Sequence, residues 1–171
     1  LDLNGLPNLS AMFAENNNIT TIDVTGAVSL GNLNIAFNPI SSLVVHDLPL
    51  LQSVSAFGNL ISNFDIQNCP LFFTLSMGDN LLTTLDLSDV PSTTIVDANN
   101  NQLNTLFLAA ENEIVQINLA NNLLTEIDLN SCFNLNWGSF NNNPNLESIL
   151  LKNGSTESLF NINISNLPSL Q

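Results

Sequence analysis

Few residues of this chain could carry acid–base or nucleophilic chemistry. His46 is the single histidine, and with Asp47 beside it marks the one place where a general base adjoins a carboxylate. A catalytic triad is defined by its geometry, so a base and a carboxylate that are neighbours in sequence are weak grounds for one. We place His46 on a solvated turn before Leu48 and expect that the chain has no catalytic residues and is not an enzyme.

Residue spacing also gives little support for a metal site. Cys69, Cys132 and His46 lack the ligand spacing of a zinc site. Calcium accepts carboxylate and amide oxygens, and the richest runs of these are residues 97–101 and 79–80. Neither run places paired carboxylates in a loop of the required kind. We expect no cofactor and no metal, with a structural calcium as the alternative.

The composition excludes several classes of partner. Of the 171 residues, 44% are hydrophobic, which is ample for a core, whereas 9% are charged and the net charge is −14. Lys152 is the sole lysine or arginine, so the clustered cations that bind nucleic acid or an anionic membrane are missing. No stretch approaches the ~20 apolar residues of a spanning helix, and we expect no direct membrane insertion.

These residues are embedded in a 21-residue repeat. Apolar residues stand eight, five and three positions before most copies of a recurring asparagine, and again two positions after it. The recurring residues are Asn17, Asn38, Asn59, Asn80, Asn101, Asn122 and Asn143. The stretch from Leu30 to Ile40 fits the template L-x-x-L-x-L-x-x-N-x-L at every marked position, which is the leucine-rich-repeat signature. Leu146 arrives one residue late, after an insertion around Pro144.

The repeat predicts a mainly β solenoid of 21-residue coils over residues 1–171, a single domain with little or no α-helix. Alternating apolar residues before each recurring asparagine predict a short strand, and equivalent strands should stack into a parallel concave sheet. The apolar-Asp-apolar segments 22–24, 64–66, 85–87 and 127–129 predict extended convex segments with the aspartates in solvent. Gly138 and Phe140 reverse the large-then-small order of other coils, which keeps the core volume roughly constant.

We interpret the recurring asparagines as a structural ladder. An amide side chain can satisfy backbone groups that the turn out of the strand leaves unpaired. Loss of Asn80 or Asn101 should therefore destabilise the fold more than loss of Asn112 or Asn134, which lie off this column.

The two cysteines share a column with Leu48 and Val90 and stand three coils apart. At ~4.8 Å per coil, their Cα atoms should lie ~14 Å apart. A disulfide spans at most about 7 Å, so Cys69 and Cys132 should be unbridged and buried.

Outward strand positions form the candidate binding face. Most carry small or amide side chains, and none is basic. The candidate binding residues are Phe13, Asn32, Asn34, Phe57, Ile95, Asp97, Gln116, Asn118 and Trp137. Four of them, Phe13, Phe57, Ile95 and Trp137, would leave an apolar side chain in water. Trp137 is the candidate contact hot spot, because tryptophan is enriched at such spots.

The sequence resembles bacterial leucine-rich-repeat proteins of the internalin-like type, whose short repeats have a similar period. Residues 122–129 (NLLTEIDL) and 143–146 (NPNL) are similar to Asn-rich surface repeat proteins of flavobacteria and their relatives (Bacteroidetes). Residues 152–155 (KNGS) resemble the irregular coil near the end of their arrays. The resemblance covers essentially the whole chain. It implies a solenoid that is exported to the cell surface and associated with the outer membrane.

These observations favour a non-enzymatic recognition or scaffold module that binds a protein partner through its concave face. One alternative is a carbohydrate-binding adhesin or an accessory subunit of an outer-membrane uptake complex, with glycans held by amides and aromatic rings. Another is a passive spacer. We expect about eight coils, with an irregular coil near residues 151–159. Both ends fall in the middle of a coil, so we expect a longer parent chain.

Overall fold

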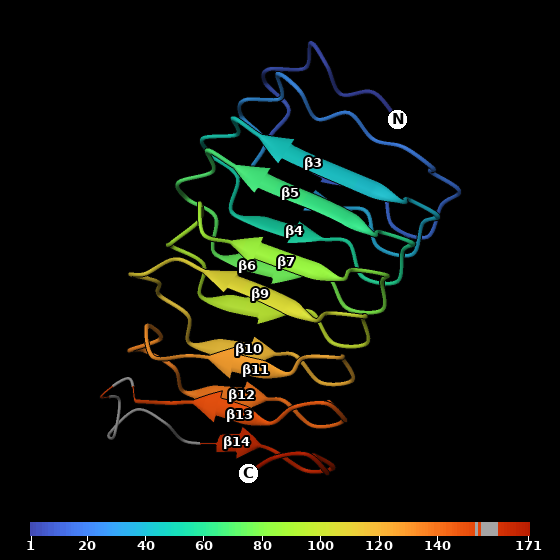
Figure 1. Ribbon diagram of the computed structural model, residues 1–171. Helices are drawn as coiled ribbons and strands as arrows, with labels where there is room; N and C mark the ends of the chain where they lie inside the picture. The colour runs from blue at the N-terminus through green and yellow to red at the C-terminus, as the bar shows by residue number, and fades with distance from the viewer. Residues whose placement is uncertain (153, 155–160) are drawn as a thin grey trace.

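The computed structural model describes residues 1–152, 154 and 161–171. Within them, short strands and tight turns wind the chain into stacked coils, and no helix is present (Figure 1). The strands are β1 (Ala11–Phe13), β2 (Asn32–Asn34), β3 (Ser42–His46), β4 (Ser53–Ser55), β5 (Asn63–Gln67), β6 (Thr74–Ser76), β7 (Thr84–Leu87), β8 (Ile95–Asp97), β9 (Thr105–Leu108), β10 (Gln116–Asn118), β11 (Glu126–Asp128), β12 (Trp137–Ser139), β13 (Ser148–Leu150) and β14 (Asn161–Asn163). The expected mainly β leucine-rich-repeat solenoid is confirmed.

One strand of each coil joins a single parallel sheet, which we call the concave sheet. Its order is β1-β2-β4-β6-β8-β10-β12-β14. Met12 pairs with Leu33, and Leu33 pairs with Val54, so each partner stands one full period further along the chain. The last step pairs Trp137 with Asn161, which is three positions longer than the period. The irregular coil expected at residues 151–159 falls there, but residues 153 and 155–160 lie outside the described part of the chain.

The opposite face carries the convex strands, which run against the direction of the concave ones (Figure 1). They form three separate parallel pairs, β3–β5, β7–β9 and β11–β13. The predicted extended convex row is therefore present but divided into pairs. In the first coils it is reduced to a single bridge between Asp2 and Asp23. In the pair β11–β13, Glu126 pairs with Ser148, one position more than the period, which reflects the one-residue insertion around Pro144.

The core lies between the two faces and consists of stacked apolar columns. Phe72 and Phe140 are its largest fully buried side chains. A Cβ atom built on Gly138 would lie 2.7 Å from Cζ of Phe140 and 3.0 Å from Cδ1 of Ile162. Gly138 therefore vacates the volume that the Phe140 ring occupies.

The asparagine ladder lines the turn that leaves the concave sheet. Asn80 is typical: its amide nitrogen donates to the carbonyls of Ala56 and Met77 at 2.9 and 3.1 Å. Its Oδ1 accepts from the N–H of Ile61 at 2.9 Å. Each such residue bonds within its own coil and to the preceding one, so it ties two coils together. The residues with this pattern are Asn38, Asn59, Asn80, Asn101, Asn122 and Asn143. Asn17 is exposed and donates within its own coil.

A second column stands directly before the ladder. Its residues all have a left-handed backbone, with φ between 52° and 68°. They are Asn16, Phe37, Gly58, Asp79, Asn100, Asn121, Asn142 and Asn166. Asparagine, aspartate and glycine tolerate this conformation best. Two columns thus explain much of the chain's asparagine content, and Phe37 is the exception in the second column.

Candidate functional site

The concave sheet gathers most of the predicted binding residues into two columns. Strand pairing aligns the first column over Asn32, Ile95, Gln116 and Trp137. It aligns the second over Phe13, Asn34, Asp97 and Asn118. Phe57 lies two residues beyond the second column, just past the end of β4.

The apolar members of this face differ in exposure. Phe13 is 69% exposed and Ile95 is 38% exposed. The expectation that all four apolar side chains stand in water is wrong for Phe57 and Trp137, which are half-buried. The Phe57 ring meets the Phe37 ring edge to face, with centroids 5.5 Å apart. A solenoid face is pleated and each coil shades the next, so outward-pointing residues are partly covered by their neighbours.

Several polar members of the face bond to the protein itself. Oδ1 of Asn34 accepts from the N–H of Ala36 at 3.2 Å. Oδ1 of Asn118 likewise accepts from the N–H of Ala120, at 3.3 Å. Asn32 accepts from the hydroxyl of Ser53 at 2.8 Å. These oxygens close turns and link coils, so the face offers a ligand fewer acceptors than its composition suggests.

Asp97 is the one carboxylate of this set. Half-burial raises its pKa, opposed by hydrogen bonds from the Asn99 N–H and the Asn118 side chain, and the charge of Asp79 raises it further. Among the described residues, no three His, Cys, Asp or Glu side chains are grouped so that they could hold a metal ion.

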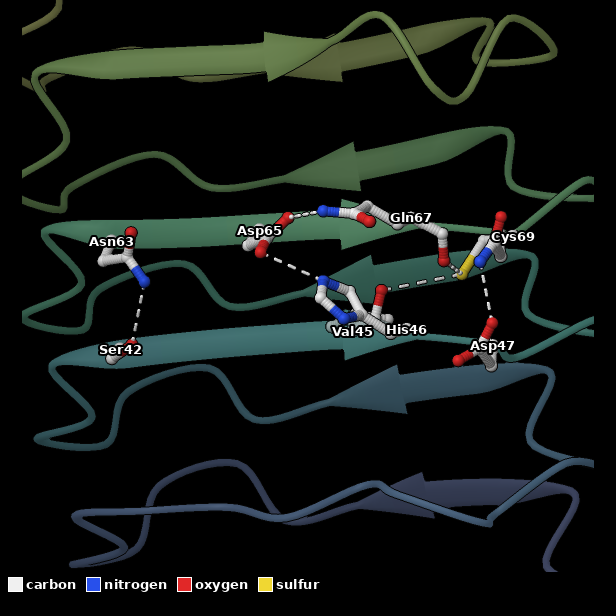
Figure 2. Close-up of polar contacts among 9 residues, drawn as sticks. Ser42, Val45, His46, Asp47, Asn63, Asp65, Gln67 and Cys69 are labelled. Atoms are coloured by element: carbon white, nitrogen blue, oxygen red, sulfur yellow. Dashed lines mark hydrogen bonds and ion pairs between the residues drawn. The ribbon is translucent and has the colours of Figure 1, made fainter.

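His46 lies on the convex face, and its predicted setting is wrong in two respects. It is the last residue of β3 and not part of a solvated turn. Its carboxylate neighbour is Asp65 on the adjacent strand β5, whose Oδ2 lies 3.0 Å from Nε2 of His46 (Figure 2). This contact, with a hydrogen bond from Gln67, lowers the pKa of Asp65. Asp47, the sequence neighbour, instead accepts from Asn68 at 2.8 Å.

Cys69 follows strand β5 and carries a thiol, but the geometry does not activate it as a nucleophile. Its sulfur donates to the carbonyls of Gln67 and Val45, at 3.3 and 3.8 Å, and not to His46 (Figure 2). Burial raises the pKa of the thiol, which disfavours the nucleophilic thiolate. Cys132 is also buried, and both thiols are unbridged, as the column spacing predicts. No histidine–thiol pair therefore forms in the described part of the chain.

Asn112 is a residue whose role sequence reasoning missed. It is buried, and its amide donates to the carbonyl of Ala109 at 2.9 Å and to the hydroxyl of Ser131 at 3.0 Å. It therefore satisfies convex backbone groups much as the ladder does on the other side. The expectation that Asn112 matters less because it lies off the column is not supported by these contacts.

Sequence reasoning also missed Phe37 as a surface residue. Its side chain is 53% exposed, although it stands outside the outward strand columns. The available signal was the residue type, because the equivalent positions of the other coils hold Asn, Asp or Gly.

No protein-family profile and no curated protein matches this chain. Among solved structures it is similar to the functional domain of InlJ from Listeria monocytogenes, which includes a cysteine ladder. The TM-score is 0.49 at 19% sequence identity, over 88% of this chain and 45% of that one. The chain thus spans less than half the length of that structure. A likeness at this identity concerns the fold alone. Within the described residues, no helix is long and apolar enough to cross a bilayer.

Proposed function

We propose that the chain is a non-enzymatic recognition module that binds a protein partner through its concave sheet. The observation that carries this proposal is the sheet itself, eight strands wide, with small outward side chains around the exposed Phe13 and Ile95. Backbone hydrogen bonds join each coil to the next, for example from Ala14 N–H to Asn34 O at 2.8 Å. A surface fixed in this way loses little conformational entropy when it binds.

A protein partner suits this face better than a glycan. Sugar hydroxyls need several free polar groups that converge on one point. Here the oxygens of Asn32, Asn34 and Asn118 already accept hydrogen bonds from the protein. With 15 carboxylates against one lysine, the chain favours a partner whose surface is basic.

The cell surface is the location that we propose. The support is the sequence resemblance to Asn-rich surface repeat proteins of flavobacteria, carried by residues 122–129 and 143–146. We propose that the module is associated with the outer membrane there.

The test is selection of peptides from a yeast-displayed library of random 12-residue sequences on the immobilised chain, with a glycan array run in parallel. Selected peptides are then titrated calorimetrically against Phe13→Ser and Ile95→Ser. Phe107→Ser is the matched control, since Phe107 is 51% exposed but lies on the convex strand β9.

We expect peptides whose affinity falls about tenfold or more in the two concave variants and is unchanged in the control. Peptides that depend on Phe107 instead would place the binding face on the convex side. Glycan binding without peptide binding would replace the proposal by the carbohydrate-binding adhesin or uptake subunit. If neither a peptide nor a glycan binds, the proposal is replaced by the passive spacer.

A further inference from the structure

Among the described residues with a left-handed backbone, Phe37 is the exception, because all the others are Asn, Asp or Gly. Its φ is 56°, a conformation that costs a side chain with a bulky Cβ substituent more than it costs Asn, Asp or Gly. The architecture imposes this conformation, because the Phe37 N–H donates to Phe57 O at 2.8 Å in the cross-coil pattern of the column. An asparagine, as at position 16 or 100, would satisfy the same backbone without the strain.

The strain is not offset by burial in the core. The ring of Phe37 is 53% exposed and touches the edge of Phe57. Glycines make room for both rings. A Cβ on Gly58 would lie 2.7 Å from Cδ1 of Phe37, and one on Gly78 would lie 2.9 Å from Cε2 of Phe57. Each of the two rings therefore packs over a glycine of the following coil.

The Phe37 ring forms one wall of a surface hollow at the edge of the concave sheet, which we call the edge hollow. Its lining residues are Asn17, Asn18, Phe37, Asn38, Pro39, Gly58, Asn59 and Leu60. The amide nitrogens of Asn17, Asn38 and Asn59 already donate to backbone carbonyls. The surface left for a ligand consists of Phe37, Pro39, the half-exposed Leu60 and the exposed Asn18.

The charges around the edge hollow are negative. Glu15 stands one coil before Phe37, and Asp79 stands two coils after it in the same column as Phe37. Both are exposed. Lys152, the sole lysine or arginine, is in a coil near the other end of the chain.

From these observations we infer that Phe37 is a recognition residue, held in a strained backbone so that its ring receives an apolar side chain from a basic segment of a protein partner. Glu15 and Asp79 face the basic residues that flank that side chain. The inference rests on the proposed function and names the contact and the partner chemistry within it. A contribution of Phe37 to binding explains why a phenylalanine occupies a position where it costs stability.

The test uses Phe37→Asn, with Phe107→Asn as the control of nearly equal exposure on the convex face. Because asparagine suits the left-handed backbone, we expect Phe37→Asn to raise the melting temperature by about 2–4 °C. The same variant should weaken the library-selected 12-residue peptides at least about tenfold. Those peptides should carry one large apolar residue between lysines or arginines. Phe107→Asn should leave their affinity unchanged.

Each other outcome overturns a stated part of the inference. A lower melting temperature in Phe37→Asn would show that Phe37 serves the fold through Phe57. Peptides that require Phe13 and Ile95 but bind Phe37→Asn normally would leave the proposed function standing and remove this contact. Binding of a glycan that is lost in Phe37→Asn would make the edge hollow a sugar site. If no peptide is selected, both the inference and the proposed function fail.

Discussion

At each turn out of the concave sheet, two successive residues do different physical work. The first takes the left-handed backbone. In the turns that end at Asn38, Asn59, Asn80, Asn101, Asn122 and Asn143, the second turns its amide inward to bond the backbone of two coils. Asn100 and Asn101 show both roles side by side, with φ of 52° at Asn100 and a 3.0 Å bond from Asn101 to Met77 O. Either role admits asparagine, but the second requires a donor and an acceptor on one short side chain.

Truncation of a ladder residue should therefore be costly. In Asn80→Ala or Asn101→Ala, several buried backbone groups lose their partner, and we expect the free energy of unfolding to fall by about 1–3 kcal/mol. Asn134→Ala, at an exposed position, should change it by less than about 0.5 kcal/mol. Urea unfolding at equilibrium measures both. Asn112→Ala should lower the free energy of unfolding about as much as the ladder variants do. Equal urea midpoints for Asn80→Ala and Asn134→Ala would refute the structural role of the ladder.

Replacement of Asp97 is expected to stabilise the fold, whereas replacement of a ladder residue destabilises it. Burial raises its folded-state pKa above the usual 3.8, so ionisation at neutral pH disfavours the folded state. This penalty is absent below pH 3.8 and develops as the pH rises through the folded-state pKa. Asp97→Asn keeps an acceptor for the Asn99 N–H and removes the charge. We expect it to raise the melting temperature at pH 7 and to leave it unchanged near pH 3. A loss of stability at pH 7 would show that the carboxylate is favourably solvated.

At the scale of the strand and turn, the period determines most of what can be predicted. A shift by one residue would turn every side chain to the other face, so the 21-residue period fixes the register and the concave columns from β1 to β12. The role of each turn residue was harder to predict from the sequence, because asparagine or aspartate can serve in the ladder, at the left-handed position or as a cap. The convex Asp86 shows this. It was expected only to face solvent, whereas its Oδ1 also accepts from the N–H of Ser88 at 3.0 Å.

The candidate site was predicted in part for the same reason. Columns place Phe13 and Ile95 on the outward face, but periodicity says nothing about how far each coil shades the next, as at Trp137. The pairing of His46 with Asp65 is a contact between coils that sequence neighbours do not reveal. Phe37 lies in a turn, where periodicity assigns no inward or outward direction.

The coil of β12 offers a test of packing at this scale. Phe140→Ala should cost about 3–5 kcal/mol, because it empties volume in the core. Gly138→Val alone should also destabilise, since its Cβ would meet the Phe140 ring. The double variant restores the order seen at Val96 and Ala98, where a large residue precedes a small one. We expect it to be more stable than Phe140→Ala by at least about 1 kcal/mol in urea unfolding. Simple additivity of the two losses would contradict the compensation.

Over the whole molecule, the coils contact chiefly their immediate neighbours, so like charges in a column repeat along the stack. Strands of neighbouring coils are ~4.8 Å apart. The convex column carries Asp2, Asp23, Asp65, Asp86 and Asp128 and has apolar residues at Val44 and Phe107. With a net charge of −14, the folded stack concentrates negative charge that the unfolded chain would spread. Val44 separates Asp23 from Asp65, and Phe107 separates Asp86 from Asp128; each of the two apolar side chains is about half exposed. Asp65 and Asp86 stand in successive coils with no residue of the column between them.

This repulsion should make the stability of the solenoid depend on salt. The Debye length falls from ~30 Å at 0.01 M to ~3 Å at 1 M ionic strength, which is shorter than the spacing of the coils. We therefore expect the melting temperature to rise by several degrees between 0.01 and 1 M NaCl at pH 7. The control is Asp86→Asn with Asp128→Asn, which keeps an acceptor for the N–H groups of Ser88 and Asn130 while removing two charges. This double variant should melt higher than the parent at low salt and respond less to added NaCl. An equal salt response in parent and variant would mean that NaCl acts on apolar burial and not on the carboxylates, because that effect is independent of charge.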